Sequence, residues 1–169
     1  MLDKILNYKF YYYKFTLIFK EEIILDEIDQ SILIQLQKNA RISMTELGRE
    51  IGLSTPATNE RVKKLEDKEV IKGYRATIDP EKLNKNVTAF ILFDTKQGKK
   101  FKDFCRKEPV VVECHRLAGQ FSYLVKVVTE SVKTLEEFID ATLPFGEPTT
   151  LIKLSSVVEY KPFTKDVIV

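Results

Sequence analysis

The sequence contains few of the residues on which metal binding and covalent chemistry depend. Its 169 residues include two cysteines, Cys105 and Cys114, and one histidine, His115. Two cysteines provide no disulfide framework, which indicates a reducing, cytoplasmic compartment. A tetrahedral zinc site needs more Cys or His ligands than these, and on a strand Cys114 and His115 would point to opposite faces. We therefore expect neither a metal ion nor another cofactor.

Charge of one sign and long apolar runs are also scarce. The 27 Lys and Arg against 25 Asp and Glu give a net charge of +2, which excludes a polybasic, histone-like DNA binder but not a modest sequence-specific one. Residues 8–19 are aromatic and apolar, but lysines interrupt them and they are too short for a membrane span. They lack the small-residue cleavage site of a signal peptide. For residues 1–24 three interpretations remain: an added edge strand, a disordered arm, or translation from an upstream start. We favour the last two in combination.

Signatures of catalysis are missing as well. The sequence has no nucleophile–base pair, no Gly-rich loop that could cradle a phosphate and no cluster of metal ligands. The adjacent Cys114 and His115 are weak support for an enzyme. We therefore expect a protein that is not an enzyme and that has no membrane partner.

The stretch 44–63 predicts two short helices joined by a tight turn. Ser43 begins the first helix with a capping-box pattern, and Gly52 permits the left-handed turn that ends it. Pro56 suits the first turn of the second helix, where its missing N–H costs nothing. The arrangement is typical of a helix-turn-helix whose second helix enters the major groove of DNA. A helical hairpin that only packs has the same spacing and remains the alternative.

The flanking sequence completes a winged helix-turn-helix over residues 25–78. A further helix is predicted from Asp26 to Asn39, ahead of the two helices. After them, residues 70–71 and 74–78 are expected to form short extended segments. Residues 79–86, with an Asp-Pro pair and a polar run, are predicted to be a linker.

From Val87 the pattern predicts the order β-α-β-β-α-β, which is the ferredoxin-like fold, so the whole chain is expected to be α+β. This second domain would span residues 87–169. Its predicted strands are residues 87–95, 110–117, 123–128 and 149–158, and its predicted helices are 99–107 and 131–143.

The first strand of this domain is apolar on both faces. Two helices can cover only one face of the sheet, so Phe90 and Leu92 on the other face need a partner. A two-fold dimer packed sheet to sheet would bury them. The alternative is that the aromatic N-terminal arm covers this face.

The run from Leu25 to about Val158 resembles the Lrp/AsnC, or feast/famine, family of transcription regulators. The resemblance is carried by LDEIDQSILIQLQKNARISMTELGREIGLS, ERVKKLE, VIKGYRATIDPEKL and GQFSYLVKV. It implies a winged helix-turn-helix joined to a ligand-sensing βαββαβ domain. It also implies dimers that assemble into tetramers, octamers or larger rings, binding to double-stranded promoter DNA, and a response to amino acids. Such a protein would be cytoplasmic and nucleoid-associated.

Mapped onto this sequence, the resemblance and the chemistry of the side chains predict which residues contact DNA. Contacts with base edges are assigned to Thr55, Pro56, Asn59 and Lys63, because Asn can pair with adenine and Lys can donate to guanine. Phosphate contacts are assigned to Arg41, Ser43, Thr45, Lys64 and Lys72. Met44, Ser54 and Thr58 complete the expected DNA-binding set. Arg61 could reach a phosphate or brace the helix, and it is left unassigned.

The resemblance places the effector site between protomers, near the turn formed by residues 116–124. Gly119, Phe121, Tyr123 and Leu124 match the family pattern, but Ser122 stands where members commonly have Asp. A neutral hydroxyl binds an ammonium group more weakly than a carboxylate does. We therefore expect a different effector or none. The residues predicted to line the site are Arg116, Gly119, Gln120, Phe121, Ser122 and Tyr123.

Two functions remain open at this point. The first is a sequence-specific transcription regulator that responds to an amino acid or a related small effector. The alternative is an effector-independent architectural protein that bends DNA and organises the chromosome, an alternative that Ser122 keeps open.

Overall fold

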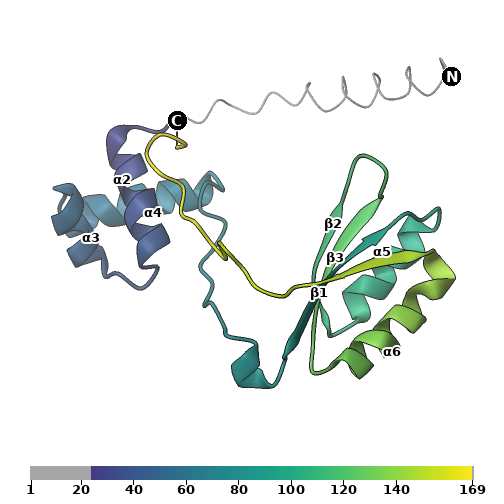
Figure 1. Ribbon diagram of the computed structural model, residues 1–169. Coiled ribbons are helices and arrows are strands. Elements are labelled where there is room, and N and C mark those ends of the chain that lie inside the picture. Colours follow the sequence, from purple (N-terminus) through teal and green to yellow (C-terminus); the bar gives the residue numbers. More distant parts are fainter. Residues whose placement is uncertain (1–23, 169) are drawn as a thin grey trace, which may run out of the picture. The chain divides into compact units, whose positions relative to one another are not determined.

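The computed structural model describes residues 24–168, which form two compact units (Figure 1). One unit contains the residues up to Arg75 together with those from Tyr160 onward, and the other contains Ala76–Glu159. The predictions for the N-terminal arm, including its alternative role as a cover for the sheet, fall on residues 1–23 and so lie outside the described residues.

The first unit is built on three helices, α2 (Glu27–Lys38), α3 (Met44–Ile51) and α4 (Thr55–Asp67). Each begins where a capping side chain satisfies free backbone N–H groups, as the sequence predicts. Asp26 accepts hydrogen bonds from the N–H groups of Ile28 and Asp29, while Ser43 and Ser54 cap α3 and α4. The helices enclose a small apolar core made of Ile32, Leu36, Leu47, Val62 and Leu65.

The segment after α4 differs from the prediction. Among the described residues from 68 to 80 there is no strand, although two short extended segments are expected there. Val70 and Ile71 instead donate from their N–H groups to the Leu65 carbonyl, at 2.9 and 3.1 Å, and close the end of α4. An extended segment becomes a strand only when a second segment pairs with it, and none does so here. The predicted linker holds one turn of 3₁₀ helix, Glu81–Leu83.

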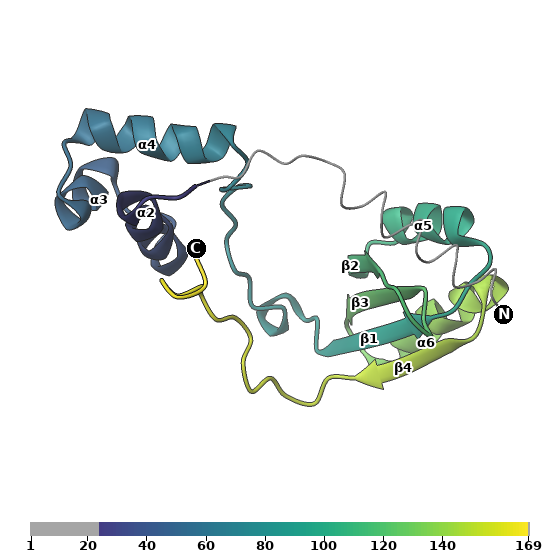
Figure 2. The same cartoon turned by 90° about the horizontal axis from the view of Figure 1, so that it is seen from above.

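The second unit has the predicted β-α-β-β-α-β order. Its elements are β1 (Val87–Phe93), α5 (Gly98–Lys107), β2 (Val111–Arg116), β3 (Tyr123–Thr129), α6 (Val132–Thr142), the 3₁₀ turn Leu143–Phe145 and β4 (Pro148–Ile152). The strands form one antiparallel sheet in the order β2-β3-β1-β4. Both helices lie on the same face of this sheet (Figures 1 and 2). There they bury Ala89, Ile91 and Phe93 of β1 completely.

The other face of the sheet is uncovered by any described element of this unit. Phe90 and Leu92 lie on it and are half-buried, as the alternation along β1 predicts. Leu151, which pairs with Phe90 across the sheet, is 51% exposed. The apolar open face is therefore present in the structure.

The end of the chain departs from the predicted domain boundary. The strand expected over residues 149–158 stops at Ile152, near the point where its partner β1 begins, and Leu154 and Val157 are almost fully exposed. Residues from Tyr160 onward belong to the first unit, not to the domain predicted for residues 87–169. They lie beside α2 (Figures 1 and 2).

Two side chains of α2 contact this C-terminal segment: Glu27 lies 3.7 Å from the Lys165 ammonium group, and Gln37 forms hydrogen bonds. The Gln37 side-chain oxygen accepts hydrogen bonds from the Phe163 N–H at 2.9 Å and from the Tyr160 hydroxyl at 3.3 Å. The Gln37 amide nitrogen donates to the Phe163 carbonyl at 3.3 Å. Ile168 is buried at the end of the same segment. The sequence contains no periodic signal in this stretch, because the segment forms no regular element.

Candidate nucleic-acid interface

The turn between α3 and α4 has the geometry that the sequence predicts. The Ser43 hydroxyl accepts from the Glu46 N–H at 3.1 Å, and Gly52 ends α3 with φ 74° and ψ 28°, in the left-handed region. Only the serine half of the expected capping box forms, since the Glu46 carboxylate lies 3.9 Å from Arg49. Ser54 then caps α4 through the Ala57 N–H at 3.4 Å, with Pro56 in the first turn.

Gly48 sets how closely the two helices approach, and sequence reasoning missed it. A Cβ at this position would lie 2.7 Å from the Leu53 carbonyl oxygen and 2.8 Å from Thr58 Oγ1. Gly48 is buried, and its own carbonyl accepts from the Leu53 N–H at 2.8 Å. A glycine inside a short helix is the sequence signal for such a contact, because glycine is unfavourable there without a packing reason.

The exposed side of α4 carries three of the four residues assigned to base edges. Pro56, Asn59 and Lys63 are exposed, and Asn59 and Lys63 line one surface groove together with Met44 of α3. Thr55 is half-buried, and its hydroxyl lies 3.3 Å from that of Thr45 on α3. The structure therefore brings a hydrogen-bonding amide and an ammonium group side by side on the second helix of the motif.

Thr58 does not belong to this surface. Its side chain is completely buried and donates to the Ser54 carbonyl at 2.9 Å. A group that water cannot reach cannot touch DNA without unfolding the turn, so Thr58 is removed from the predicted DNA-binding set. Its place on the inner side of α4, four residues before Val62, accounts for its burial.

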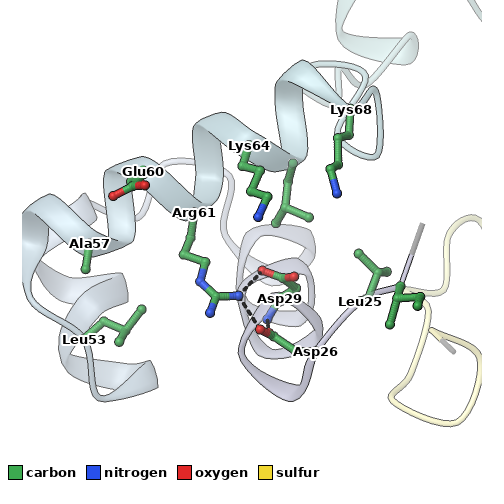
Figure 3. Close-up of a pocket in the computed structure, with 11 residues that line it drawn as sticks. Leu25, Asp26, Asp29, Leu53, Ala57, Glu60, Arg61, Lys64 and Lys68 are labelled. Atoms are coloured by element: carbon green, nitrogen blue, oxygen red, sulfur yellow. Dashed lines mark hydrogen bonds and ion pairs between the residues drawn. The ribbon is translucent and has the colours of Figure 1, made fainter. Parts of the chain in front are cut away.

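Lys64 faces a different cavity from its neighbour Lys63. Figure 3 shows Lys64 and Lys68 on the side of α4 that carries Arg61, above the N-terminus of α2. One residue along a helix turns a side chain by about 100°. Lys63 and Lys64 therefore cannot make the same kind of contact with one DNA groove.

Arg61 braces α4 against α2. Its guanidinium pairs with Asp26 and lies 3.0 Å from Asp29, as Figure 3 shows. The Asp29 backbone N–H and the Arg61 guanidinium hold the pKa of Asp26 below its usual value. A guanidinium held by two carboxylates is occupied, so the bracing role fits Arg61 better than a phosphate contact.

The remaining phosphate candidates carry available donors. Arg41, Ser43, Thr45 and Lys72 are all exposed. Within residues 24–168, the side chains of Arg41, Lys63, Lys64 and Lys72 form no ion pair. Such side chains can turn toward a phosphate without first breaking an internal contact.

In the second unit, the predicted effector turn is closed by backbone hydrogen bonds. The Leu117 N–H donates to the Ser122 carbonyl at 2.9 Å, and the Ser122 N–H donates to the Phe93 carbonyl at 2.7 Å. Gly119, at φ 144°, allows the chain to reverse. Gly119 and Gln120 are exposed at the tip, while Phe121 and Ser122 are half-buried.

The structure adds a carboxylate to this turn. Asp94, the exposed residue just after β1, accepts a hydrogen bond from the Ser122 hydroxyl at 2.8 Å. The negative charge that the sequence lacks at position 122 is thus supplied by another strand end. Sequence reasoning could not place Asp94 there, because the two residues meet only when β1 and β3 pair.

Tyr123 is a core residue in this structure, not a surface residue of the turn. Its side chain is 1% exposed and packs on Phe101, with ring centroids 5.2 Å apart. Arg116 donates to the Tyr123 hydroxyl at 3.1 Å and lies over the ring. Tyr123 therefore positions the Arg116 guanidinium and offers an effector no exposed surface of its own.

Comparisons with known proteins agree with both units. A family of winged helix-turn-helix DNA-binding domains matches residues 25–72, and the Lrp/AsnC ligand-binding domain matches residues 88–163. The HTH-type transcriptional regulator YezC of Bacillus subtilis (strain 168) is 55% identical over 132 residues, which are 78% of this chain and 95% of YezC. The chain belongs to the Lrp/AsnC family.

Two further transcriptional regulators are similar over most of their length. The regulator LrpC of Bacillus subtilis (strain 168) is 36% identical over 79% of this chain and 94% of LrpC, and the structure of B. subtilis LrpC superposes with a TM-score of 0.77. The structure of the regulator NMB0573 of Neisseria meningitidis, in complex with L-Met, is 26% identical, covers 86% of this chain and 100% of its own, and has a TM-score of 0.80.

Membership confirms the resemblance and the expected α+β fold. The protein is a DNA-binding transcription regulator with a ligand-binding domain, and its family is one of regulators, not of enzymes. None of the helices within residues 24–168 combines the length and the apolar character that crossing a membrane requires.

Proposed function

We propose that this Lrp/AsnC protein is a sequence-specific regulator that reads its operator with the exposed side of α4. The observation that carries the proposal is the pairing of Asn59 and Lys63 on one groove of the second helix of the motif. An amide that can bond adenine and an ammonium group that can bond guanine suit the edges of bases in the major groove. Arg41, Thr45 and Lys72 would hold the motif on the phosphates.

The protein would act as a dimer joined through the open face of its sheet. Phe90 and Leu92 lie on this face. A two-fold axis would bury both copies of the patch in one contact, and it would present two recognition helices to successive turns of DNA. Larger assemblies of such dimers, tetramers or octamers, would be built on the same unit.

The effector would be a small molecule with an ammonium group, such as an amino acid. The support for this is the Asp94 carboxylate held at the Ser122 hydroxyl, which replaces the Asp that the family pattern has at position 122. A carboxylate binds an ammonium group with a charge-assisted hydrogen bond, about twice as strong as a neutral one. The L-Met bound to NMB0573 is a ligand of this class.

Calorimetric titration with a panel of amino acids tests the effector. We expect one member of the panel to bind the wild-type protein and to bind Asp94→Asn at least about tenfold more weakly, a loss of roughly 1.4 kcal/mol. Asp140→Asn, an exposed aspartate on α6, is the matched control and should bind as the wild type does. Absence of binding by the whole panel would favour an effector-independent architectural protein.

Competition with random DNA tests sequence specificity. A site-specific regulator should prefer its operator by about a thousand-fold or more at physiological salt. An architectural protein would bind both DNAs with similar affinity and with the same steep dependence on salt concentration.

A further inference from the structure

The two cysteines of the chain meet in space although nine positions separate them. Cys105 lies on α5 and Cys114 on β2, and both line one surface cavity together with Lys102 and Arg106. Cys105 is 5% exposed, whereas Cys114 is an exposed free thiol. In the sequence, His115 is the residue next to Cys114 that could react or bind a metal with it. In the fold, the reactive group near Cys114 is instead the thiol of Cys105.

Strand pairing explains this meeting. Cys114 is opposite Val125, which is buried on the helix-covered face, while His115 is opposite Leu124 on the open face. Residues directly opposite each other in an antiparallel pair share a face, so Cys114 points toward α5. His115 is instead hydrogen-bonded to Glu113 at 3.2 Å, on the open face.

The two thiols differ in reactivity. Burial, and after it the neighbouring Cys114 thiol, raise the pKa of Cys105 to about 12. Because the thiolate is the nucleophile, Cys105 does not start a reaction with an oxidant. Cys114 is exposed, so it is the thiol that an oxidant meets first, and the Cys105 S–H lies behind it as a second reactant.

We propose that Cys105 and Cys114 are a reversible dithiol–disulfide site that joins α5 to β2 when a hydroperoxide is present. Two observations carry it: both cysteines line one cavity, and Cys114 is exposed while Cys105 is buried. The site stands apart from DNA binding and from the effector, so it does not rest on the proposed function.

The chemistry balances in two steps. The Cys114 thiolate attacks one oxygen of hydrogen peroxide, an S–O bond forms, the O–O bond breaks and, with a proton, water leaves. The Cys105 sulfur then attacks the Cys114 sulfenic acid, the S–S bond forms, the S–O bond breaks, and the Cys105 proton leaves in a second water. Two thiols lose two electrons, which reduce the peroxide. A small thiol reverses the reaction by thiol–disulfide exchange.

The position of β2 makes the bond feasible and gives it a consequence. Among the described strands, β2 lies at the edge of the sheet and pairs with β3 alone, and its register shifts between Val111 and Glu113. An edge strand can move toward a helix without breaking pairs on its other side. Because β2 ends at Arg116, the bond would fix α5 to the strand that leads into the effector turn.

Mass spectrometry of the full-length chain tests the proposal. The reduced protein is treated with a small molar excess of hydrogen peroxide and then denatured in the presence of iodoacetamide, which alkylates free thiols. Its mass is then measured. We expect the mass to fall by two hydrogen atoms with no alkylation, and digestion to give one peptide pair linked through Cys105 and Cys114. Dithiothreitol should then restore two alkylatable thiols.

Two single variants assign the roles. In Cys114→Ser, Cys105 should survive the same peroxide treatment as a free thiol. In Cys105→Ala, Cys114 should stop at a sulfenic acid that dimedone labels. The proposal is overturned if the wild-type protein gives a disulfide between two chains, or a Cys114 sulfinic acid, while Cys105 stays free. The wild-type result decides the matter even if Cys105→Ala folds poorly.

Discussion

Lys63 and Lys64 are neighbours in the sequence, yet α4 directs them to different sides. Lys63 shares a groove with Asn59, and Lys64 lies beside Arg61. A base contact specifies sequence, whereas a phosphate contact only positions the protein. The two lysines should therefore differ in what their loss changes, and this difference is measurable.

The first prediction concerns Lys63. Lys63→Glu should weaken operator binding by at least about 10- to 100-fold, because it removes a donor to a base edge, a contact that contributes roughly 1–3 kcal/mol, and adds a repelling charge. Fluorescence anisotropy with labelled operator DNA measures the affinity. Lys133→Glu, on the exposed side of α6, changes the net charge equally and should leave binding nearly intact. Equal effects of the two variants would remove Lys63 from the recognition surface.

The second prediction concerns Gly48. Replacing a glycine inside a helix by alanine usually stabilises the helix by about 0.5–1 kcal/mol. Here the added Cβ meets the Leu53 carbonyl and the Thr58 hydroxyl below 3 Å. Gly48→Ala should therefore lower the free energy of unfolding, by about 1–3 kcal/mol. Thermal unfolding followed by circular dichroism checks the sign, and a raised melting temperature would contradict the close approach.

At the scale of the elements, local signals in the sequence were sufficient wherever neighbours in the chain decide the structure. Asp26 and Ser43 mark two helix starts in the sequence and Ser54 or Thr55 marks the third, where the structure has Ser54, because a cap acts within three residues. The two-residue period of β1 places Phe90 and Leu92 on one face and Ala89, Ile91 and Phe93 on the other. These signals predict the order of the helices of the first unit and of the helices and strands of the second.

Features that depend on residues far apart in the sequence could not be predicted. The carboxylate of Asp94 reaches Ser122 only through the pairing of two strands. The segment after α4 could have been a strand by composition, but no described segment pairs with it. The return of the C-terminal segment to α2 uses the side chains of Gln37 and Glu27, which carry no pattern in the sequence.

The third prediction concerns that C-terminal segment. Gln37→Ala removes three hydrogen bonds to Tyr160 and Phe163, so the DNA-binding unit should unfold about 1–3 kcal/mol more easily. Hydrogen exchange of the α2 amides would report the loss. Gln30→Ala, on the same helix, is the control, because its side chain makes no hydrogen bond with the described residues. Unchanged exchange in Gln37→Ala would show that the segment does not stabilise α2.

At the scale of the whole molecule, one apolar face of the sheet is left open by the described elements of its unit. Two helices cover one face, and no described element of this unit covers the apolar residues of the other face. The family assignment gives the two halves their tasks, DNA binding and ligand binding, but a single chain offers one recognition helix. A dimer formed through the sheet would supply a second recognition helix and would also bury the open face of the sheet.

The fourth prediction tests this dimer. Phe90→Lys places a charge in the centre of the proposed contact, where an unpaired buried charge is strongly unfavourable. Sedimentation analysis should show a monomer for Phe90→Lys and a dimer or larger assembly for the wild type. Leu154→Lys is the control, since Leu154 is 95% exposed and lies outside the sheet. An unchanged mass for Phe90→Lys would place the oligomer interface elsewhere.

We propose that this protein is a dimeric, site-specific regulator. A protection footprint on the DNA upstream of its own gene, with and without amino acids, tests it most directly. We expect discrete protected patches spaced by about one helical turn, ~10 bp, which change when the effector is added. Uniform coverage that fades with salt at every position would contradict the claim and would identify an architectural DNA-binding protein instead.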